Sequence, residues 1–299
     1  MINRQSFSTQ NKAELYALSA VLLWSTVASA FKISLKALTF EELIFYSLPA
    51  SIISLAFIIT ARKKWKEVLI LKSIYKSLLF GLVNPFIYYL ILFKAYELLP
   101  AQQAQPLNNT WTVILTILSA VILKQKFKVK DFISVLISFS GAILIITGGN
   151  FSGLNNINIE GVLFALSSAV IWASYWLIIK IDSKDGSSDT AVRLFGCFLS
   201  GLIYITIYML LKGSFRSHSL PEILPAFYVG LFEMGITFYL WSRAVHLSLN
   251  TARISNLIFL TPFLSFIFIS VILGETIKAA SAAGLILITA GIAYGRSGK

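Results

Sequence analysis

The stretch Phe227–Trp241 reads FYVGLFEMGITFYLW, and it is apolar almost throughout except for one carboxylate, Glu233, near its centre. Nine residues into a membrane-spanning helix, Glu233 lies roughly 13 Å deep at 1.5 Å per residue. An ionised side chain at that depth costs about 3 kcal/mol or more, so by default it marks a functional site. The helical period places three further residues on the same face: Gly230, Thr237 and Trp241. We predict that this face lines the cavity of a small-molecule transporter.

The composition of the chain indicates a polytopic α-helical membrane protein. The 299 residues are 57% hydrophobic and only 13% charged, whereas soluble domains carry about 25% charged residues. A net charge of +12 would suit nucleic acid, but in so apolar a chain its placement in short loops indicates membrane topology. The one cysteine, Cys197, excludes an intramolecular disulfide, and the two histidines lack ligand-like spacing. No metal site and no cofactor are expected.

Apolar segments recur along the whole chain, and most approach the ~20 residues that span a bilayer core. The ten predicted membrane helices cover residues 14–34, 42–61, 74–93, 102–123, 131–148, 161–180, 191–211, 223–241, 251–273 and 280–295. Residues 1–13 form a polar tail that we expect to be disordered, and residues 296–299 form a second tail.

The basic residues predict the orientation of the chain. With the N-terminus inside, 19 of the 25 Lys and Arg residues fall in cytoplasmic segments and 6 fall outside. This asymmetry favours both termini in the cytoplasm, and we expect a multi-pass protein of the cytoplasmic (inner) membrane. The loop at residues 149–160 has no basic residue and reads as an external linker between two halves.

The two halves resemble each other in sequence, which is the strongest sign of organisation. ALSAVLLW at Ala17–Trp24 matches ALSSAVIW at Ala165–Trp172 at an offset of 148. Gly81 falls on Gly230 at an offset of 149. Each half, 14–148 and 161–295, holds five predicted helices, an odd number, so the second half enters the membrane from the opposite side. The fold class is therefore all-α, with two inverted five-helix repeats, and such repeats usually hold a midplane site at their interface.

Several motifs resemble those of a known family: LLWST at Leu22–Thr26, AVIWASYW at Ala169–Trp176, and NTWTVILTILSAV at Asn109–Val121. With the ten-helix pattern, they make the whole chain resemble the EamA type of the drug/metabolite transporter superfamily, and most of all its aromatic amino-acid exporter branch. The second half carries the family's pattern of Pro262 followed by Glu275, whereas the first half has Thr112 and Gln125 at the matching places. The resemblance implies alternating access through a central cavity and leaves the substrate open.

The repeat pairs Glu233 with Asn84 at an offset of 149. We interpret the two as substrate-binding groups that face each other across the cavity. Glu233 is also a candidate proton carrier, because burial raises the pKa of a carboxyl group. A structural hydrogen bond between packed helices is the alternative for both residues. Pro85, next to Asn84, leaves a helix carbonyl free and is expected to bend the helix.

The segment at 102–123 begins with an unusually polar stripe, Gln102, Gln105, Asn109 and Thr112. Membrane helices do not present four such groups to lipid, so the stripe faces either a cavity or another helix, and we favour the cavity. Pro106 should disturb this helix. Near residue 250, Arg253 and Asn256 are further candidates for binding, although Arg253 is equally explained as a cationic side chain that reaches back to the cytoplasmic surface.

Aromatic residues supply the remaining binding candidates: Trp24, Tyr88, Trp111, Trp172, Tyr175 and Trp176. Those within the middle of predicted helices favour an aromatic cavity lining, whereas Trp at a helix end is usually an interface anchor. Such a lining suits a planar, apolar or cationic substrate.

These observations predict a secondary transporter that exports an amino acid or related metabolite. Import or exchange of a cationic or nucleoside-like metabolite, such as an S-adenosyl compound, is the alternative, and a lipid scramblase or membrane-embedded enzyme is a remote one. The sequence contains no Walker A, H-E-x-x-H or G-x-S-x-G motif, so we expect no enzyme activity. The expected partners are a small-molecule substrate and the lipid bilayer, with no nucleic acid, and the chain is expected to act as a monomer.

Overall fold

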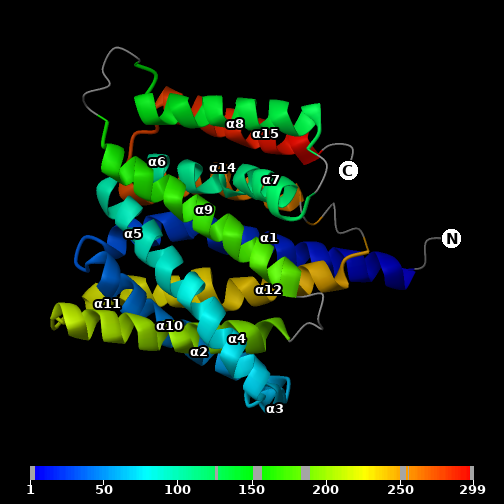
Figure 1. Ribbon diagram of the computed structural model, residues 1–299, viewed down its shortest axis with the longest axis vertical. Helices are drawn as coiled ribbons and strands as arrows, with labels where there is room; N and C mark the ends of the chain where they lie inside the picture. The colour runs from blue at the N-terminus through cyan, green and yellow to red at the C-terminus, as the bar shows by residue number, and fades with distance from the viewer. Residues whose placement is uncertain are drawn as a thin grey trace. The chain divides into compact units, whose positions relative to one another are not determined.

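The computed structural model is built from helices (Figure 1). The structure describes residues 4–124, 127–150, 157–182, 189–249, 254 and 256–296, and none of them lies in a β-strand. Seven helical stretches among them are long and apolar enough to cross a membrane: Thr9–Ser34, Phe40–Ala61, Ser73–Leu98, Val129–Thr147, Ile159–Ile179, Thr190–Lys212 and Leu220–Leu247. Shorter apolar helices cover Leu260–Leu273 and Ala279–Gly295. The ten-span topology stays a prediction.

Two expectations from the sequence are wrong in detail. Helix α1 runs from Arg4 to Ser34, so residues 4–13 are helical and do not form a disordered tail. The segment predicted as one helix over 102–123 is two helices, α6 (Ala101–Asn109) and α7 (Trp111–Ile122), that meet at Thr110. Pro106 lies inside α6, where it lacks the N–H that an uninterrupted helix would use.

The chain forms two compact units, and each draws helices from both sequence halves. Unit 1 covers 1–86 and 188–273. It contains α1, α2 (Phe40–Ala61), α3 (Trp65–Val68), α4 (Leu71–Gly81), α10 (Thr190–Lys212), α11 (Leu220–Val229), the π-helical segment η4 (Gly230–Gly235), α12 (Ile236–Leu247) and α14 (Leu260–Leu273). Within it, α1 packs on α12 and α14, while α10 packs on α2 and α4.

Unit 2 covers 87–187 and 274–299. It contains α5 (Tyr88–Leu98), α6, α7, α8 (Val129–Thr147), α9 (Ile159–Asp182) and α15 (Ala279–Arg296). Helix α9 packs on α5, α6 and α7, and α8 lies beside α15 (Figure 1). A second π-helical segment, η1 (Leu82–Ile87), connects α4 of unit 1 to α5 of unit 2 along the chain.

Small residues bring α8 and α15 together. A Cβ atom on Gly284 would lie 2.6 Å from the carbonyl oxygen of Gly141, and the Ser134 hydroxyl donates to the Gly291 carbonyl at 2.6 Å. Close backbone approach of this kind holds membrane helices together where the surrounding lipid is as apolar as the side chains.

Capping groups at the helix ends explain several of the boundaries. Thr39 and Glu42 form a capping box at the start of α2, and Ser219 and Glu222 form another at the start of α11. Such boxes satisfy backbone N–H groups that have no partner within the helix. Helix α10 ends at Gly213, whose φ of 64° lies in the left-handed region that favours glycine.

Candidate functional site

The two residues paired by the repeat, Asn84 and Glu233, lie in the six-residue segments η1 and η4, where their helices depart from regular α-helical geometry: η1 contains a kink at Asn84, and η4 is π-helical. A π-helical turn contains one more residue than an α-helical turn, and such insertions occur frequently at functional sites. The widened turn also changes the helical period within η4, and that Gly230, Glu233, Thr237 and Trp241 share one face stays a prediction. Gly230 and Thr237 are buried, whereas Glu233 and Trp241 are half-buried.

Two glycines allow the η4 segment to pack closely against α2. A Cβ atom on Gly230 would lie 2.0 Å from the Ser47 carbonyl oxygen, and one on Gly235 would lie 2.3 Å from the Ser54 hydroxyl. The backbone of Gly235, with φ −101° and ψ −95°, is not α-helical. Only residues without a side chain fit at these two places, which explains why the widened turn occurs where Gly-x-x-x-x-Gly stands in the sequence.

Trp24 and Glu233, two of the predicted site residues, meet in unit 1. The indole Nε1 of Trp24 donates to the backbone carbonyl of Glu233 at 3.4 Å. The Trp24 ring also contacts Phe238 edge-on at 5.4 Å between centroids and Trp241 at 5.7 Å. Trp24, which we predicted to line the cavity, therefore packs against the helix that carries the Glu233 carboxylate.

Asn84 interrupts its helix. Its backbone is extended, with φ −140° and ψ 115°, and the ring of Pro85 fills the space beside Gly201 on α10, where an added Cβ would lie 2.4 Å from the proline. The break that Pro85 predicts is therefore present. The Asn84 side chain is 1% exposed, and its Oδ1 has no hydrogen-bond partner in the part of the chain that the structure describes.

A buried polar atom without a protein partner requires an explanation, such as a bound water or ligand. Asn84 therefore has the property expected of a substrate-binding group. Glu233 packs with its segment on α2 and α1, whereas Asn84 lies next to the residue that packs on α10. That the two side chains face each other across a cavity stays a prediction.

Unit 2 brings together the other predicted aromatic residues in one group, which we call the aromatic cluster: Tyr88, Trp111, Trp172, Tyr175 and Trp176. Trp172 stacks on Tyr88 at 4.5 Å and on Tyr175 at 5.6 Å between ring centroids. Trp111 stacks on Trp176 at 6.5 Å with an interplanar angle of 21°. These separations lie in the range in which aromatic rings attract each other beyond the burial of their area.

The members of the aromatic cluster differ in exposure. Tyr88, Trp172 and Tyr175 are buried, whereas Trp111 and Trp176 are half-buried. The indole Nε1 of Trp176 has no hydrogen-bond partner among the described residues. The Trp111–Trp176 pair is therefore the half-buried part of the cluster, and the Trp176 N–H within it is a buried donor.

A short chain of polar contacts borders the aromatic cluster. The Tyr88 hydroxyl donates to Asn108 Oδ1 at 3.5 Å, Asn108 Nδ2 donates to the Ser168 hydroxyl at 2.9 Å, and that hydroxyl donates to the Ala165 carbonyl at 2.6 Å. Asn108 and Ser168 were not among the predicted site residues. Asn108 belongs to the run of polar residues in α6 that is visible in the sequence. The predicted stripe, however, placed its neighbour Asn109 on the functional face.

The residues of the predicted polar stripe have different roles in the structure. Gln102 is a structural residue, because its Nε2 donates to the Thr276 carbonyl at 3.0 Å and its Oε1 accepts from the Lys278 N–H at 2.9 Å. Glu275 also accepts hydrogen bonds from the backbone N–H groups at the start of α6. Gln105 is buried, and its Oε1 has no partner within the described ranges.

The other polar candidates have less defined surroundings. Asn109 is half-buried, and its carbonyl oxygen accepts from Thr112 at 3.4 Å. Asn256 is exposed, and Arg253 lies outside the described residues. No group of three His, Cys, Asp or Glu residues within the described part of the chain is placed to hold a metal ion.

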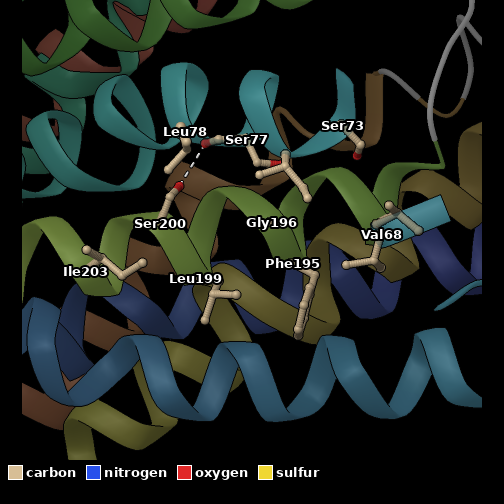
Figure 2. A pocket seen from close by; sticks show the side chains of 11 residues that line it. Val68, Ser73, Ser77, Leu78, Phe195, Gly196, Leu199, Ser200 and Ile203 are labelled. Atoms are coloured by element: carbon tan, nitrogen blue, oxygen red, sulfur yellow. Dashed lines mark hydrogen bonds between the residues drawn. The ribbon is translucent and has the colours of Figure 1, made fainter. Parts of the chain in front are cut away.

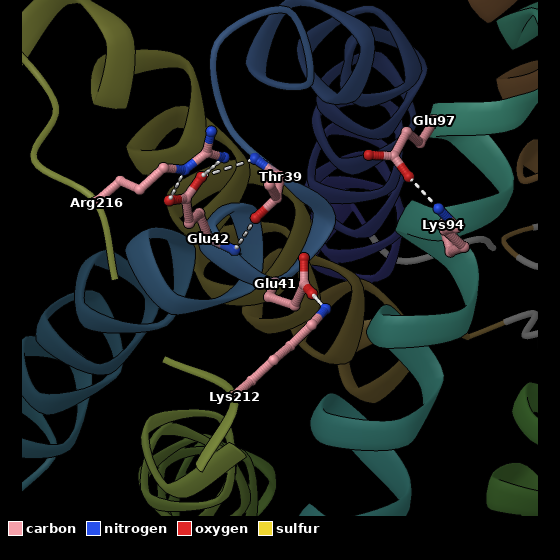
Figure 3. Close-up of polar contacts among 7 residues, drawn as sticks. All are labelled: Thr39, Glu41, Glu42, Lys94, Glu97, Lys212 and Arg216. Carbon is pink, nitrogen blue, oxygen red and sulfur yellow. Dashed lines mark hydrogen bonds and ion pairs between the residues drawn. The ribbon is translucent and has the colours of Figure 1, made fainter. Parts of the chain in front are cut away.

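The start of α2 holds two buried carboxylates that the sequence analysis did not identify, Glu41 and Glu42, which are 2% and 1% exposed (Figure 3). Glu42 accepts two hydrogen bonds from Arg216, at 3.0 and 2.9 Å, and Glu41 pairs with Lys212. His218 Nε2 lies 3.0 Å from Glu42. The hydrogen bond to Glu42 raises the pKa of the Arg216 guanidinium above its usual range. The contacts attach the 213–219 loop to α2.

Long apolar helices, buried polar groups inside them and interrupted helices define a multi-pass membrane protein of the transporter class. The sequence matches the EamA-like transporter family over residues 11–147 and 159–294. The chain belongs to this family. The names of the family and of the relatives both indicate a transporter.

Similar proteins from several organisms agree with this assignment. An uncharacterized transporter of Clostridium kluyveri is 27% identical over 57% of this chain and 55% of its own length. An uncharacterized transporter in the sor 3' region of Acidianus ambivalens is 30% identical over 55% of this chain and 61% of its length. The matches thus span less than two thirds of these two relatives. The uncharacterized transporter YvbV of Bacillus subtilis is 25% identical over 71% of this chain and 68% of its length.

A solved crystal structure has the same fold. It matches with a TM-score of 0.68 and 21% sequence identity, over 96% of this chain and 96% of that one. At this identity the match shows the fold alone.

Proposed function

We propose that the chain is a secondary transporter that exports a small metabolite, an amino acid or a related compound, across the cytoplasmic membrane by alternating access. The observation that carries this proposal is the pair of helix interruptions at η1 and η4. Their starts, Leu82 and Gly230, and their ends, Ile87 and Gly235, are both 148 residues apart. Interrupted helices at corresponding positions of two halves are the best sequence-level indication of a transporter binding site.

The proposed inverted repeat has further support from the helix boundaries. The run of α4, η1 and α5 covers 71–98, and the run of α11, η4 and α12 covers 220–247, so both ends are displaced by 149 residues. The family also matches the chain in two successive segments. We therefore keep the halves 14–148 and 161–295, with both termini in the cytoplasm, as the proposed topology.

Each unit, taken by itself, carries groups that suit an amino-acid substrate. In unit 1, the Glu233 carboxylate and the Asn84 amide are groups that bind an ammonium or a carboxylate. In unit 2, the half-buried Trp111–Trp176 pair suits a planar or apolar side chain. These features support the aromatic amino-acid exporter branch as the proposed subfamily.

A planar cation, such as a nucleoside-like or S-adenosyl compound, is the second candidate. The stacked rings of the aromatic cluster favour it, because tryptophan faces attract cations. For such a substrate the proposed activity is import or exchange, and the test below includes this class.

Thermal unfolding of the purified protein in detergent distinguishes these substrates. A ligand at about 100 times its Kd stabilises the native state by about 2.7 kcal/mol. We expect amino acids with aromatic side chains to raise the unfolding midpoint more than polyamines, nucleosides or S-adenosyl compounds do. No rise with any of these soluble metabolites would contradict the proposal and favour a scramblase.

Variants then assign the binding groups. E233Q and W176L should remove the ligand-induced rise, while E160Q, at an exposed carboxylate, and F139L, at an exposed ring on α8, should retain it. If E233Q and W176L both keep the full rise, these residues do not bind the substrate.

Glu233 is also the proposed proton carrier. In proteoliposomes, we expect uptake of the identified substrate to respond to an imposed pH gradient, and we expect E233Q to abolish this response. An E233Q protein that transports with the full pH-gradient dependence would eliminate Glu233 both as the proton carrier and as a group required for binding the substrate.

A further inference from the structure

A partly open, mostly apolar groove of about 150 Å³ runs between α4 and α10 in unit 1 (Figure 2). Its walls come from three helices, and the lining residues are Val68 on α3, Ser73, Ile74, Ser77 and Leu78 on α4, and Val192, Phe195, Gly196, Leu199, Ser200 and Ile203 on α10. This groove belongs neither to the π-helical segments nor to the aromatic cluster.

Tight packing fixes the floor of the groove. A Cβ atom on Gly196 would lie 2.1 Å from the Ser77 hydroxyl, so α4 and α10 approach each other closely there. The Ser200 hydroxyl also donates to the Ser77 carbonyl at 2.8 Å, as the dashed line in Figure 2 shows. Because Ser200 donates to backbone carbonyls and Ser77 lies against Gly196, the groove presents mainly hydrocarbon to an occupant.

The rim of the groove is apolar and exposed. Ile74, Leu78, Leu199 and Ile203 are between 41% and 49% exposed. The groove begins where the membrane-spanning stretches Ser73–Leu98 and Thr190–Lys212 begin. At 1.5 Å per residue, Leu199 lies roughly 13 Å along its helix from Thr190, which is about the depth of one leaflet's hydrocarbon. A lipid acyl chain fits both this chemistry and this position.

Basic residues stand next to the mouth of the groove. Between α2 and α4 the sequence reads RKKWK at residues 62–66. Arg62 pairs with Asp189 at 2.7 Å, and Lys64 pairs with Glu67. Lys63 and Lys66 are exposed, and neither forms an ion pair with a carboxylate of the described residues. Their charges are available to an anion at the membrane surface.

Trp65 connects this basic corner to the groove. Its ring contacts Phe195, a groove-lining residue, at 5.4 Å, and its Nε1 donates to the Thr60 hydroxyl at 2.9 Å. Val68, two residues beyond Lys66, also lines the groove. Tryptophan is enriched at the level of the lipid headgroups, so the corner is placed where a phosphate would lie when an acyl chain fills the groove.

We propose that this groove and the adjacent corner form a binding site for an anionic phospholipid, with an acyl chain along α4 and α10 and the phosphate beside Lys63 and Lys66. An anionic lipid is favoured over bulk zwitterionic lipid because basic residues beside a membrane helix attract net negative headgroups. The lining of the groove includes none of the proposed substrate-binding residues, so the test of this site does not require the substrate to be known.

Native mass spectrometry of the full-length protein tests the proposal. The protein in detergent is mixed with equal amounts of phosphatidylglycerol and phosphatidylcholine that carry identical acyl chains. We expect at least threefold more bound phosphatidylglycerol than phosphatidylcholine. K63Q/K66Q should remove this preference, whereas the matched variant K124Q/K128Q, which loses two exposed charges elsewhere, should keep it.

Two further arms test the acyl-chain groove. Glycerophosphoglycerol, which has the headgroup without acyl chains, should fail to displace phosphatidylglycerol from the wild-type protein. L199W, which fills the groove, should bind less phosphatidylglycerol while its unfolding midpoint stays unchanged. Equal binding of the two lipids by wild type, equal losses in the two double variants, or full displacement by the chainless headgroup would each overturn the proposal.

Discussion

The indole N–H of Trp24 donates to the backbone carbonyl of Glu233 across 209 residues of sequence, at 3.4 Å. This contact ties α1 to the π-helical segment of unit 1. A π-helical turn changes the backbone hydrogen-bond pattern of its helix, so a side-chain donor at that point supports the local backbone. The position of the Glu233 side chain therefore depends on a residue of the first predicted membrane helix.

Replacing Trp24 with Phe tests this support. W24F keeps an aromatic ring against Phe238 and Trp241 but removes the N–H donor. We expect stability to fall by about 1 kcal/mol, the usual net contribution of one hydrogen bond, and we expect ligand affinity to fall as well. The measurement is the unfolding midpoint with and without ligand. W65F is the matched control, because Trp65 donates to Thr60 in an exposed setting, and it should leave ligand affinity unchanged.

Replacing Asn84 should affect substrate binding without lowering the stability of the fold. The Asn84 Oδ1 is buried and has no partner among the described residues, and removing an unsatisfied buried polar group by a residue of similar shape is nearly neutral or stabilising. We therefore expect N84L to unfold at the wild-type midpoint or above it, yet to lose substrate binding. S265A, which removes another buried hydroxyl without a partner in the described residues, should change neither property. A marked destabilisation of N84L would show that the amide has a structural role.

The ion pairs at the start of α2 should stabilise unit 1. Glu42 and Glu222 occupy the same position in two capping boxes, and glutamine also serves there. E42Q therefore keeps the cap but weakens the paired contact with Arg216, whereas E222Q has no arginine to lose. Because Glu42 is buried, we expect E42Q to lower the unfolding midpoint by about 2–4 °C and E222Q to change it little. Equal shifts of the unfolding midpoint in E42Q and E222Q would show that the effect comes from the capping boxes and not from the contact with Arg216.

The contact between α8 and α15 predicts a strong size limit at Gly284. An added side chain there would meet Ile145 at 2.5 Å and the Gly141 carbonyl at 2.6 Å. Overpacking of this kind costs about 1–3 kcal/mol or more, so G284L should lower the unfolding midpoint by several degrees or prevent folding. The neighbouring exposed position provides the control, since A283L should be tolerated. A stable G284L protein would show that the two helices can separate freely.

The sequence predicts the long apolar helices, because apolar length is a local property. It also predicts the break at Pro85, since proline removes a backbone donor. The π-helical segment at Gly230–Gly235 was missed, because a fixed period of 3.6 residues cannot show an inserted residue. The common face assigned to Glu233 and Thr237 stays a prediction.

Contacts between distant residues were beyond the reach of sequence patterns. Gln102 looked like a cavity residue, but its partners lie more than 170 residues away, at Glu275 and Thr276. The capping box of Thr39 and Glu42 is readable from the sequence, whereas the Arg216 contact of Glu42 depends on how α2 and the 213–219 loop pack. Asn108 was set aside for Asn109 because the end of α6 at Asn109 was not foreseen.

Counterflow in proteoliposomes tests the central claim, secondary transport by this chain, most directly. Vesicles containing the purified protein are loaded with an excess of the unlabelled compound that best raises the unfolding midpoint, and the labelled compound is added outside at trace level. The proposal predicts a transient accumulation of label above its equilibrium value, which E233Q reduces and E160Q retains. Label that enters no faster than into protein-free vesicles, for every compound that stabilises the protein, would contradict it.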